Sequence, residues 1–218
     1  MSRPQWMPYQ NNGGTALALA GKDYAIIAAD RRLSVGYSIS TRESTKIAKL
    51  TENTVLASCG MQADRHTLHS VLSSRLQMYR LEHDKEMSTH AISELLSRTL
   101  YYRRFFVYYT FNILAGIDDK GEGYVYSYDA IGSFEAQKHA VNGDGGVLAI
   151  PLLDNFVEKK HRQLDDPKQE LSKDEALKLI KNTLNAVVER EISTGDSADI
   201  FVITKKGTTH EVFPLRKD

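Results

Sequence analysis

Residues 13–36 read GGTALALAGKDYAIIAADRRLSVG, and this stretch decides the fold. It holds two runs, TALALA from Thr15 and YAIIAA from Tyr24, that are rich in small and β-branched apolar residues. The turn formers GKD at 21–23 separate the two runs. Short apolar runs bounded by turn residues predict β-strands, so we expect the chain to open on a sheet.

The chain after this stretch continues the strand block and then turns helical. Strand-like runs at 37–41, 45–50 and 54–59 extend the block. Apolar residues then recur at helical spacing, which predicts two helices. The first apolar stripe is Leu68, Leu72, Leu76 and Tyr79, and the second is Ile92, Leu95, Leu96, Thr99 and Leu100.

A second block repeats this order. Strands are predicted at 111–118 and 124–128, followed by a helix over 145–160 and a surface loop at 165–167. A fourth helix follows, and its start has the capping-box pair Ser172 and Glu175. Its apolar face consists of Leu177, Ile180, Leu184 and Val187.

A hairpin at 200–204 and 209–214 closes the chain. Strands and helices therefore come in separate blocks, which indicates an α+β protein rather than alternating βαβ units. Two sheets need cover on both faces, so we predict a four-layer αββα sandwich with two antiparallel sheets between helix pairs. We expect a short N-terminal leader at 1–12 and a single domain at 13–218.

Composition excludes several classes of protein. The chain has 28 basic and 28 acidic residues, and this zero net charge argues against a nucleic-acid or anionic membrane partner. No apolar run approaches the roughly 20 residues of a membrane span. Residues 1–12 lack the apolar run of a signal peptide. Cys59 is the single cysteine and cannot form an internal disulfide, which fits a reducing compartment.

Three motifs carry a family resemblance: the opening stretch at 13–36, STKIAKL from Ser44 and ASCGMQAD from Ala57. With them the sequence resembles the proteasome beta-subunit family, whose fold is the αββα sandwich of N-terminal-nucleophile hydrolases. In active members a Gly–Thr bond is cleaved, and the freed threonine supplies a hydroxyl nucleophile and an α-amino group. An aspartate and a lysine follow that threonine at fixed spacing.

The resemblance assigns that aspartate to Asp30 and that lysine to Lys46, and the position of the nucleophile then falls on Gly14. Glycine has no hydroxyl with which to attack a carbonyl. The lysine would lower the proton affinity of a nucleophile, and the aspartate would hold the lysine in place. The resemblance therefore implies a catalytic site that lacks its nucleophile.

Four further positions complete this degenerate site. Gly60 matches the position whose backbone N–H serves the oxyanion hole in active members. Glu191 and Thr194 stand where the family has an aspartate and a serine, and Arg32 follows Asp30 in the same motif. Without the flanking motifs, Asp30, Arg31, Arg32 and Lys46 would be interpreted as strand-end charges that form surface ion pairs.

Thr15 provides the enzymatic alternative, because removal of residues 1–14 would give it a free α-amine. A shift of one residue along a strand turns the side chain to the opposite face, so we expect Thr15 to point away from Lys46. An active threonine hydrolase is therefore the second hypothesis. A free-standing binding domain, which predicts a monomer near 24.5 kDa, is the third.

The block YYRRFFVYYTFNILAGIDDKGEGYVYSYDAIGSFE at 101–135 narrows the resemblance to a non-catalytic member. The implied function is a structural subunit of the 20S core particle in the cytoplasm and nucleus, where ubiquitin-tagged proteins are degraded. The implied partners are beta subunits of the same and opposite rings and alpha subunits. No cofactor, metal, nucleic acid or membrane is implied.

Three local features are open to more than one interpretation. Residues 103–106, RRFF, mix basic and aromatic side chains, which suggests a nucleic-acid surface; zero net charge instead favours a helix end that packs under the sheet or against a neighbouring subunit. His66 and His69 could be a metal pair or part of a helical face, and we favour the face. Cys59 is expected to be buried and inert, and Ser58 beside it to lack a histidine partner.

Overall fold

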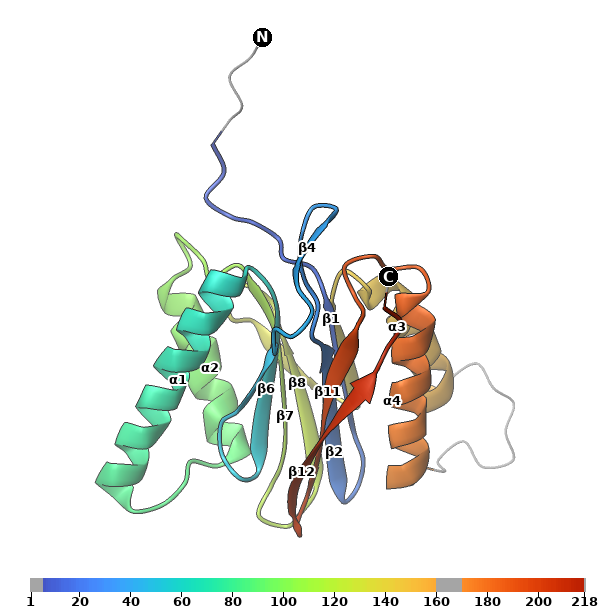
Figure 1. Ribbon diagram of the computed structural model, residues 1–218. Coiled ribbons are helices and arrows are strands. Elements are labelled where there is room, and N and C mark those ends of the chain that lie inside the picture. Colours follow the sequence, from blue (N-terminus) through green and yellow to red (C-terminus); the bar gives the residue numbers. More distant parts are fainter. Residues whose placement is uncertain (1–5, 160–169, 218) are drawn as a thin grey trace.

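The computed structural model describes residues 6–159 and 170–217. Strands, two helices, strands, two helices and strands follow one another along the chain, as predicted (Figure 1). The first sheet has the strand order β10-β1-β2-β11-β12 and is antiparallel throughout. Its strands are β1 (Thr15–Ala20), β2 (Tyr24–Asp30), β10 (His139–Gly143), β11 (Ser197–Thr204) and β12 (Gly207–Pro214).

The second sheet has the order β5-β6-β7-β8-β9 and is also antiparallel. Its strands are β5 (Ile47–Lys49), β6 (Thr54–Gly60), β7 (Thr110–Ile117), β8 (Gly123–Tyr128) and β9 (Phe134–Gln137). A separate hairpin of β3 (Leu33–Val35) and β4 (Ser38–Thr41) projects from the end of the sandwich near the N-terminal segment (Figure 1).

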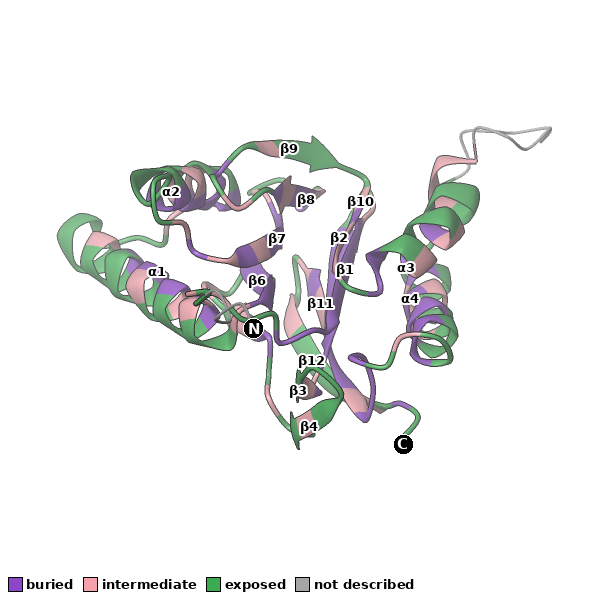
Figure 2. Ribbon diagram, turned by 90° about the horizontal axis from the view of Figure 1, so that it is seen from above, coloured by how far each residue is buried: buried purple, intermediate pink, exposed green. Residues whose placement is uncertain are grey.

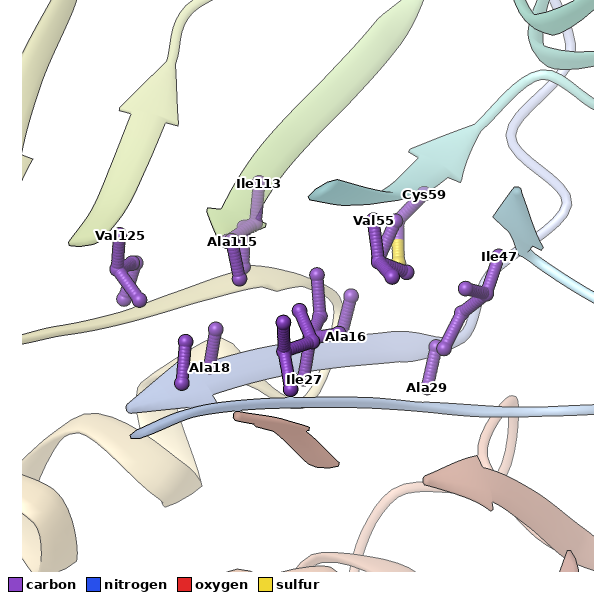
Figure 3. Close-up of a cluster of buried hydrophobic side chains, with 14 of the residues drawn as sticks. Ala16, Ala18, Ile27, Ala29, Ile47, Val55, Cys59, Ile113, Ala115 and Val125 are labelled. Atoms are coloured by element: carbon purple, nitrogen blue, oxygen red, sulfur yellow. The ribbon is translucent and has the colours of Figure 1, made fainter. Parts of the chain in front are cut away.

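The two sheets pack face to face through small and β-branched side chains. Strand residues alternate between faces, so Ala16 and Ala18 of β1 point into the space between the sheets, while Leu17 and Leu19 point to the helices. Ile113 and Val125 contribute from the second sheet (Figure 3). Because both faces of these strands are buried, TALALA is apolar at every position from Ala16 onward.

Helices cover both outer faces (Figure 2). On the second sheet lie α1 (Gln62–His83) and α2 (Thr89–Tyr102), whose buried leucines pack on Leu56 of β6. On the first sheet lie α3 (Gly146–Leu153) and α4 (Lys173–Val188). The predicted four-layer αββα sandwich is confirmed.

The predicted capping box is confirmed: Ser172 N–H donates to Glu175 Oε2 at 2.9 Å, and Glu175 N–H donates to Ser172 Oγ. The helix predicted over 145–160 is shorter, because α3 is followed by a π-helix at Asp154–Glu158. The loop predicted at 165–167 lies outside the described residues. Among the described helices, none combines the length and apolar character that a membrane crossing requires.

Three strands escaped prediction. β3 (LSV) and β9 (FEAQ) alternate apolar and polar residues, but with three and four residues they are too short for the pattern to stand out, and β10 (HAVNG) has no alternation. Their partners supply the order instead: β9 pairs with β8, and β10 pairs with β1 over Thr15↔Gly143 to Leu19↔His139. The omission matters, because β10 delivers Gly143 and the following turn beside the start of β1.

Candidate functional site

The ammonium group of Lys46 is fully buried at one end of the two sheets. Its Nζ lies 3.1 Å from Asp30 Oδ1, and it donates to the carbonyl oxygens of Asp30 at 3.0 Å and Arg32 at 2.5 Å. An ammonium has three protons, so these acceptors use all of them. Both side chains of the Asp30–Lys46 pair have no exposed surface, so the interpretation as a surface ion pair is wrong.

Asp30 is held by donors on several sides. Its Oδ1 accepts from the backbone N–H of Thr15 at 2.8 Å, and its Oδ2 accepts from the N–H of Arg32 at 3.1 Å. Burial raises the pKa of the Asp30 carboxyl, while the Lys46 ammonium and these N–H groups act to lower it. The charge of Lys46 is thus balanced by a carboxylate fixed at the end of β2.

Gly14 lies directly against this pair. A Cβ built on Gly14 would lie 2.8 Å from both Lys46 Nζ and Asp30 Oδ1, and closer still to Lys46 Cε. A side chain at position 14 would therefore point at the ammonium, in agreement with the spacing in the sequence. The lysine side chain itself fills the space that such a side chain would need.

The hydroxyl of Thr15 points toward Thr194 and not toward Lys46. Its Oγ1 lies 2.7 Å from Thr194 Oγ1, and a Cβ on Gly145 would collide with the same hydroxyl. This placement agrees with the expected reversal of faces between positions 14 and 15. Thr194 is thus brought to the site as a partner of Thr15 and not of Lys46.

Two residues that the sequence analysis missed hold Gly14 in place. Gly14 N–H donates to Ser193 Oγ at 3.1 Å, and Gly14 C=O accepts from the N–H of Asp144 at 2.9 Å. Ser193 Oγ in turn donates to Glu191 Oε1 at 2.8 Å, which gives predicted Glu191 its place in the network. Asp144 follows β10, so the unpredicted strand also concealed this residue.

The segment before Gly14 is bound in the site. Asn12 N–H donates to Gly60 C=O at 3.1 Å, and Asn12 C=O accepts from Ser34 N–H at 3.3 Å. The Asn12 side chain accepts from Gln62 N–H at 2.8 Å and donates to Ser34 C=O at 3.2 Å. Asn12 therefore bridges β3, β6 and the start of α1, and it occupies the carbonyl of predicted Gly60.

Two more contacts fix this segment. Asn11 Nδ2 donates to the carboxylate of Asp144 at 2.9 Å. The ring of Tyr9 lies 5.5 Å from that of Phe106 and 5.4 Å from that of Tyr109, and Tyr9 Oη donates to Val107 C=O. The uncut chain is therefore held at the site by hydrogen bonds of Tyr9, Asn11 and Asn12.

Arg32 acts on the site through the turn that carries Ser193 and Thr194. Its Nε donates to Asp196 Oδ2 at 2.8 Å and its Nη1 to Ile192 C=O at 2.9 Å. Burial opposes ionisation of Asp196, but hydrogen bonds from Arg32 and Arg42 hold the pKa of this carboxyl below its usual value. Arg32 is thus a buried brace for the turn at 192–196.

A separate polar cluster lies between β6 and α1. Ser58 Oγ donates to Asn112 Oδ1 at 2.6 Å and lies 2.8 Å from His69 Nε2. The expectation that Ser58 lacks a histidine partner is wrong. Because the hydroxyl proton goes to Asn112, His69 is the donor to Ser58 and does not act as its base. Burial lowers the pKa of His69 to about 4, so the imidazole is neutral near pH 7.

The remaining candidates have ordinary surroundings. Cys59 lies buried between the sheets, and burial raises the pKa of its thiol to about 12. Within residues 6–159 and 170–217, no three His, Cys, Asp or Glu side chains are grouped so that they could hold a metal ion.

The C-terminal residues 215–217 fold back on their own chain: Leu215 is buried, and Asp196 N–H donates to Arg216 C=O.

Comparisons with known proteins all find proteasome subunits. The family profile described as Proteasome subunit matches residues 10–203. Proteasome subunit beta type-1 of Dictyostelium discoideum is 48% identical over 219 residues, which cover 100% of this chain and 93% of the relative. The protein of that name from Arabidopsis thaliana is 47% identical, with 98% and 97% covered, and that from Drosophila melanogaster is 44% identical, with 100% and 93% covered.

Proposed function

Because this chain belongs to the proteasome subunit family, we propose that it is a non-catalytic beta subunit of the 20S core particle, in the position held by beta type-1. It contributes interfaces and chamber wall to a particle that degrades ubiquitin-tagged proteins in the cytoplasm and nucleus. Its partners are the beta subunits of the same and opposite rings and the alpha subunits. The threonine nucleophiles come from other subunits.

One observation supports the non-catalytic assignment: position 14, where a side chain would point at Lys46, is occupied by glycine. Catalysis by this fold needs a hydroxyl at that point and a base to take its proton. Gly14 has no hydroxyl, and its nitrogen is an amide that donates to Ser193. An amide nitrogen is not basic, so both functions of an N-terminal threonine are missing while the chain is uncut.

The residues around Gly14 support the same assignment. The protons of Lys46 go to Asp30 Oδ1 and to two backbone carbonyls, so its ammonium is bound within the chain itself. Asn12 N–H donates to Gly60 C=O, so the chain's own backbone lies against the glycine that matches the oxyanion-hole position. We propose that Gly14, Asp30, Arg32, Lys46, Gly60, Glu191 and Thr194 form a degenerate catalytic site with a structural role.

We further propose the division into a leader at 1–12 and a domain at 13–218. The last residues of this leader, Asn11 and Asn12, are bound to the domain through Asp144, Ser34 and Gly60.

The alternative function, an active hydrolase with Thr15 as nucleophile, has one point in its favour. A cut before Thr15 would free its amine 2.8 Å from Asp30 Oδ1. However, the hydroxyl that must attack is bonded to Thr194, and it would have to cross from one face of β1 to the other. We therefore place this function second.

Intact-mass measurement of the chain in the purified particle, combined with a threonine-directed epoxyketone, tests the proposal. We expect a chain that still contains Gly14, carries no adduct and elutes with a particle many times larger than 24.5 kDa. A chain that begins at Thr15 and carries the adduct would establish the enzymatic alternative. A chain that elutes only as a monomer would overturn the subunit assignment.

A further inference from the structure

The C-terminal end of α2 displays an arginine–aromatic patch, which we define as residues 101–106, YYRRFF. All six residues are exposed. Among the aromatic side chains, Phe105 is 89% exposed, Tyr102 79%, Phe106 61% and Tyr101 55%. Single exposed aromatic residues are common, but four in six consecutive positions form a contiguous apolar surface, which marks an interaction site.

The guanidinium of Arg104 is held between two rings of the patch. Its Cζ lies 4.7 Å from the centroid of Tyr101 and 4.5 Å from that of Phe105. Arg103 lies 5.6 Å from the ring of Tyr108. Stacking covers the flat faces of a guanidinium and leaves its in-plane N–H groups at the edge, where they can bind a carboxylate with two hydrogen bonds.

Neither arginine meets a carboxylate within the part of the chain that the structure describes; Arg104 makes a long hydrogen bond of 3.4 Å to Tyr101 C=O. The patch is also braced from behind. The ring of Tyr9 packs against that of Phe106 at a tilt of 31°, and its hydroxyl donates to Val107 C=O at 3.0 Å. The ring contacts of Arg103 and Arg104 restrict the two guanidinium groups, so a partner would lose less conformational entropy in binding them.

We propose that the arginine–aromatic patch docks a neighbouring protein subunit whose surface offers an acidic side chain bordered by apolar residues. The inference rests on the proposed function, because it names a contact that the assembled particle would use. A protein partner fits better than nucleic acid. Arginine and aromatic residues are enriched at protein interfaces, whereas a backbone of phosphates calls for more basic charge than two arginines in a chain of zero net charge.

Arg104 contacts two rings of the patch, and we expect it to be the central contact residue of this surface. Buried arginine and aromatic anchors carry most of the binding energy of typical interfaces. Replacement of Arg104 by lysine keeps the charge but removes the planar group that stacks between Tyr101 and Phe105. The lysine variant therefore separates recognition by stacking and a bidentate bond from simple charge attraction.

The test compares Arg104→Glu and Arg104→Lys with Lys206→Glu, a matched charge reversal at an exposed turn between β11 and β12. The full-length variants are expressed with wild-type chain in competition, and the ratio of the two in the purified large particle is measured. We expect incorporation to fall about tenfold or more for Arg104→Glu, to fall less for Arg104→Lys, and to be unchanged for Lys206→Glu.

A second measurement identifies the partner. The photoreactive residue p-benzoylphenylalanine replaces Phe105 in the full-length chain, and cross-linked peptides are sequenced. We expect cross-links to a proteasome subunit at a segment that contains aspartate or glutamate. Cross-links to nucleic acid, or normal incorporation of Arg104→Glu with no cross-link, would overturn the inference while the subunit assignment stands. Absence of even the wild-type chain from the particle would overturn both.

Discussion

The ammonium nitrogen of Lys46 lies 3.1 Å from Oδ1 of Asp30, with neither side chain exposed to solvent. Asp30 ends β2 in the first sheet, and Lys46 directly precedes β5 in the second. The pair therefore links the two sheets at the end of the sandwich where the N-terminal segment enters. A buried ion pair of this kind depends on both members, because either one alone is an uncompensated charge.

Replacement of Lys46 by methionine is expected to lower the free energy of unfolding by about 3–5 kcal/mol, because it leaves the Asp30 carboxyl buried without its counter-charge. Urea denaturation of the purified chain measures this loss. The double variant Lys46→Met/Asp30→Asn should recover part of it. Lys49→Met is the matched control, because Lys49 pairs with Glu52 at 2.7 Å on the surface and should cost about 1 kcal/mol or less. Equal losses at positions 46 and 49 would refute a buried role for the pair.

Replacement of Gly14 by threonine is expected to destabilise the chain without creating a reactive site. The backbone of Gly14 has φ +92°, a value that residues with a side chain rarely adopt, and the new side chain would overlap Lys46. Gly14→Ala isolates the cost of the added methyl group, and Gly36→Ala is its control. Gly36 has φ +58°, and no atom lies within 4 Å of the methyl group added there. We expect a loss of about 1 kcal/mol for the control, from backbone strain alone, and a clearly larger one for Gly14→Ala.

Epoxyketone labelling of the Gly14→Thr particle provides the functional readout. No adduct is expected, because Lys46 fills the space beside position 14. An adduct on the threonine introduced at position 14 would show that the hydroxyl was the single missing element of the site.

Stability should fall in mild acid because of His69. Burial, together with the charges of Arg65 and His66, lowers the pKa of His69 to about 4, below the ordinary value of 6.5. Protonation therefore favours the unfolded chain, and its effect begins as the pH falls below about 6.5 and is complete near pH 4. The shift corresponds to about 3 kcal/mol at most.

Thermal melts of the chain between pH 7 and pH 4 measure this term. A His69→Gln variant should lose part of the pH dependence, whereas His66→Gln, on the exposed face of α1, removes only the smallest contribution to the pKa shift and should change the profile much less. Identical pH profiles for wild type and His69→Gln would contradict the assignment.

Removal of the Asn12 side chain should loosen one end of α1. Gln62, the first residue of α1, donates its N–H to Asn12 Oδ1 at 2.8 Å, so Asn12→Ala leaves this donor without its acceptor. We expect a loss of about 1–3 kcal/mol and faster hydrogen exchange at the Gln62 amide. The Ser34 amide bonds to the Asn12 backbone carbonyl and serves as the internal control. Unchanged exchange at Gln62 would contradict this role.

Much of the fold was predictable because its signals are local. The runs TALALA and YAIIAA coincide with β1 and β2, and the capping box at Ser172 coincides with the start of α4. β10 was not predictable, since its sequence HAVNG has no apolar pattern and its order comes from pairing with β1. The chain at this edge is a strand because its neighbour offers unpaired N–H and C=O groups.

The candidate site also has a part that the sequence predicts and a part that it does not. The spacing of Gly14, Asp30 and Lys46 was present in the sequence, and so was the lack of a side chain at position 14. Ser193 was not, because it lies 179 residues from Gly14 and reaches it through a turn braced by Arg32.

Sequence alone determined which chemical groups this protein has and how they are spaced, since composition and spacing are properties of the chain. Only the tertiary structure decided that the Asp30–Lys46 pair is buried, that Ser58 meets His69, and that Asn12 fills the site. The physical reason is that burial and hydrogen bonding depend on which distant segments the two sheets bring together. A charged side chain has the same letter in solvent as in the core, and only its neighbours in space distinguish the two.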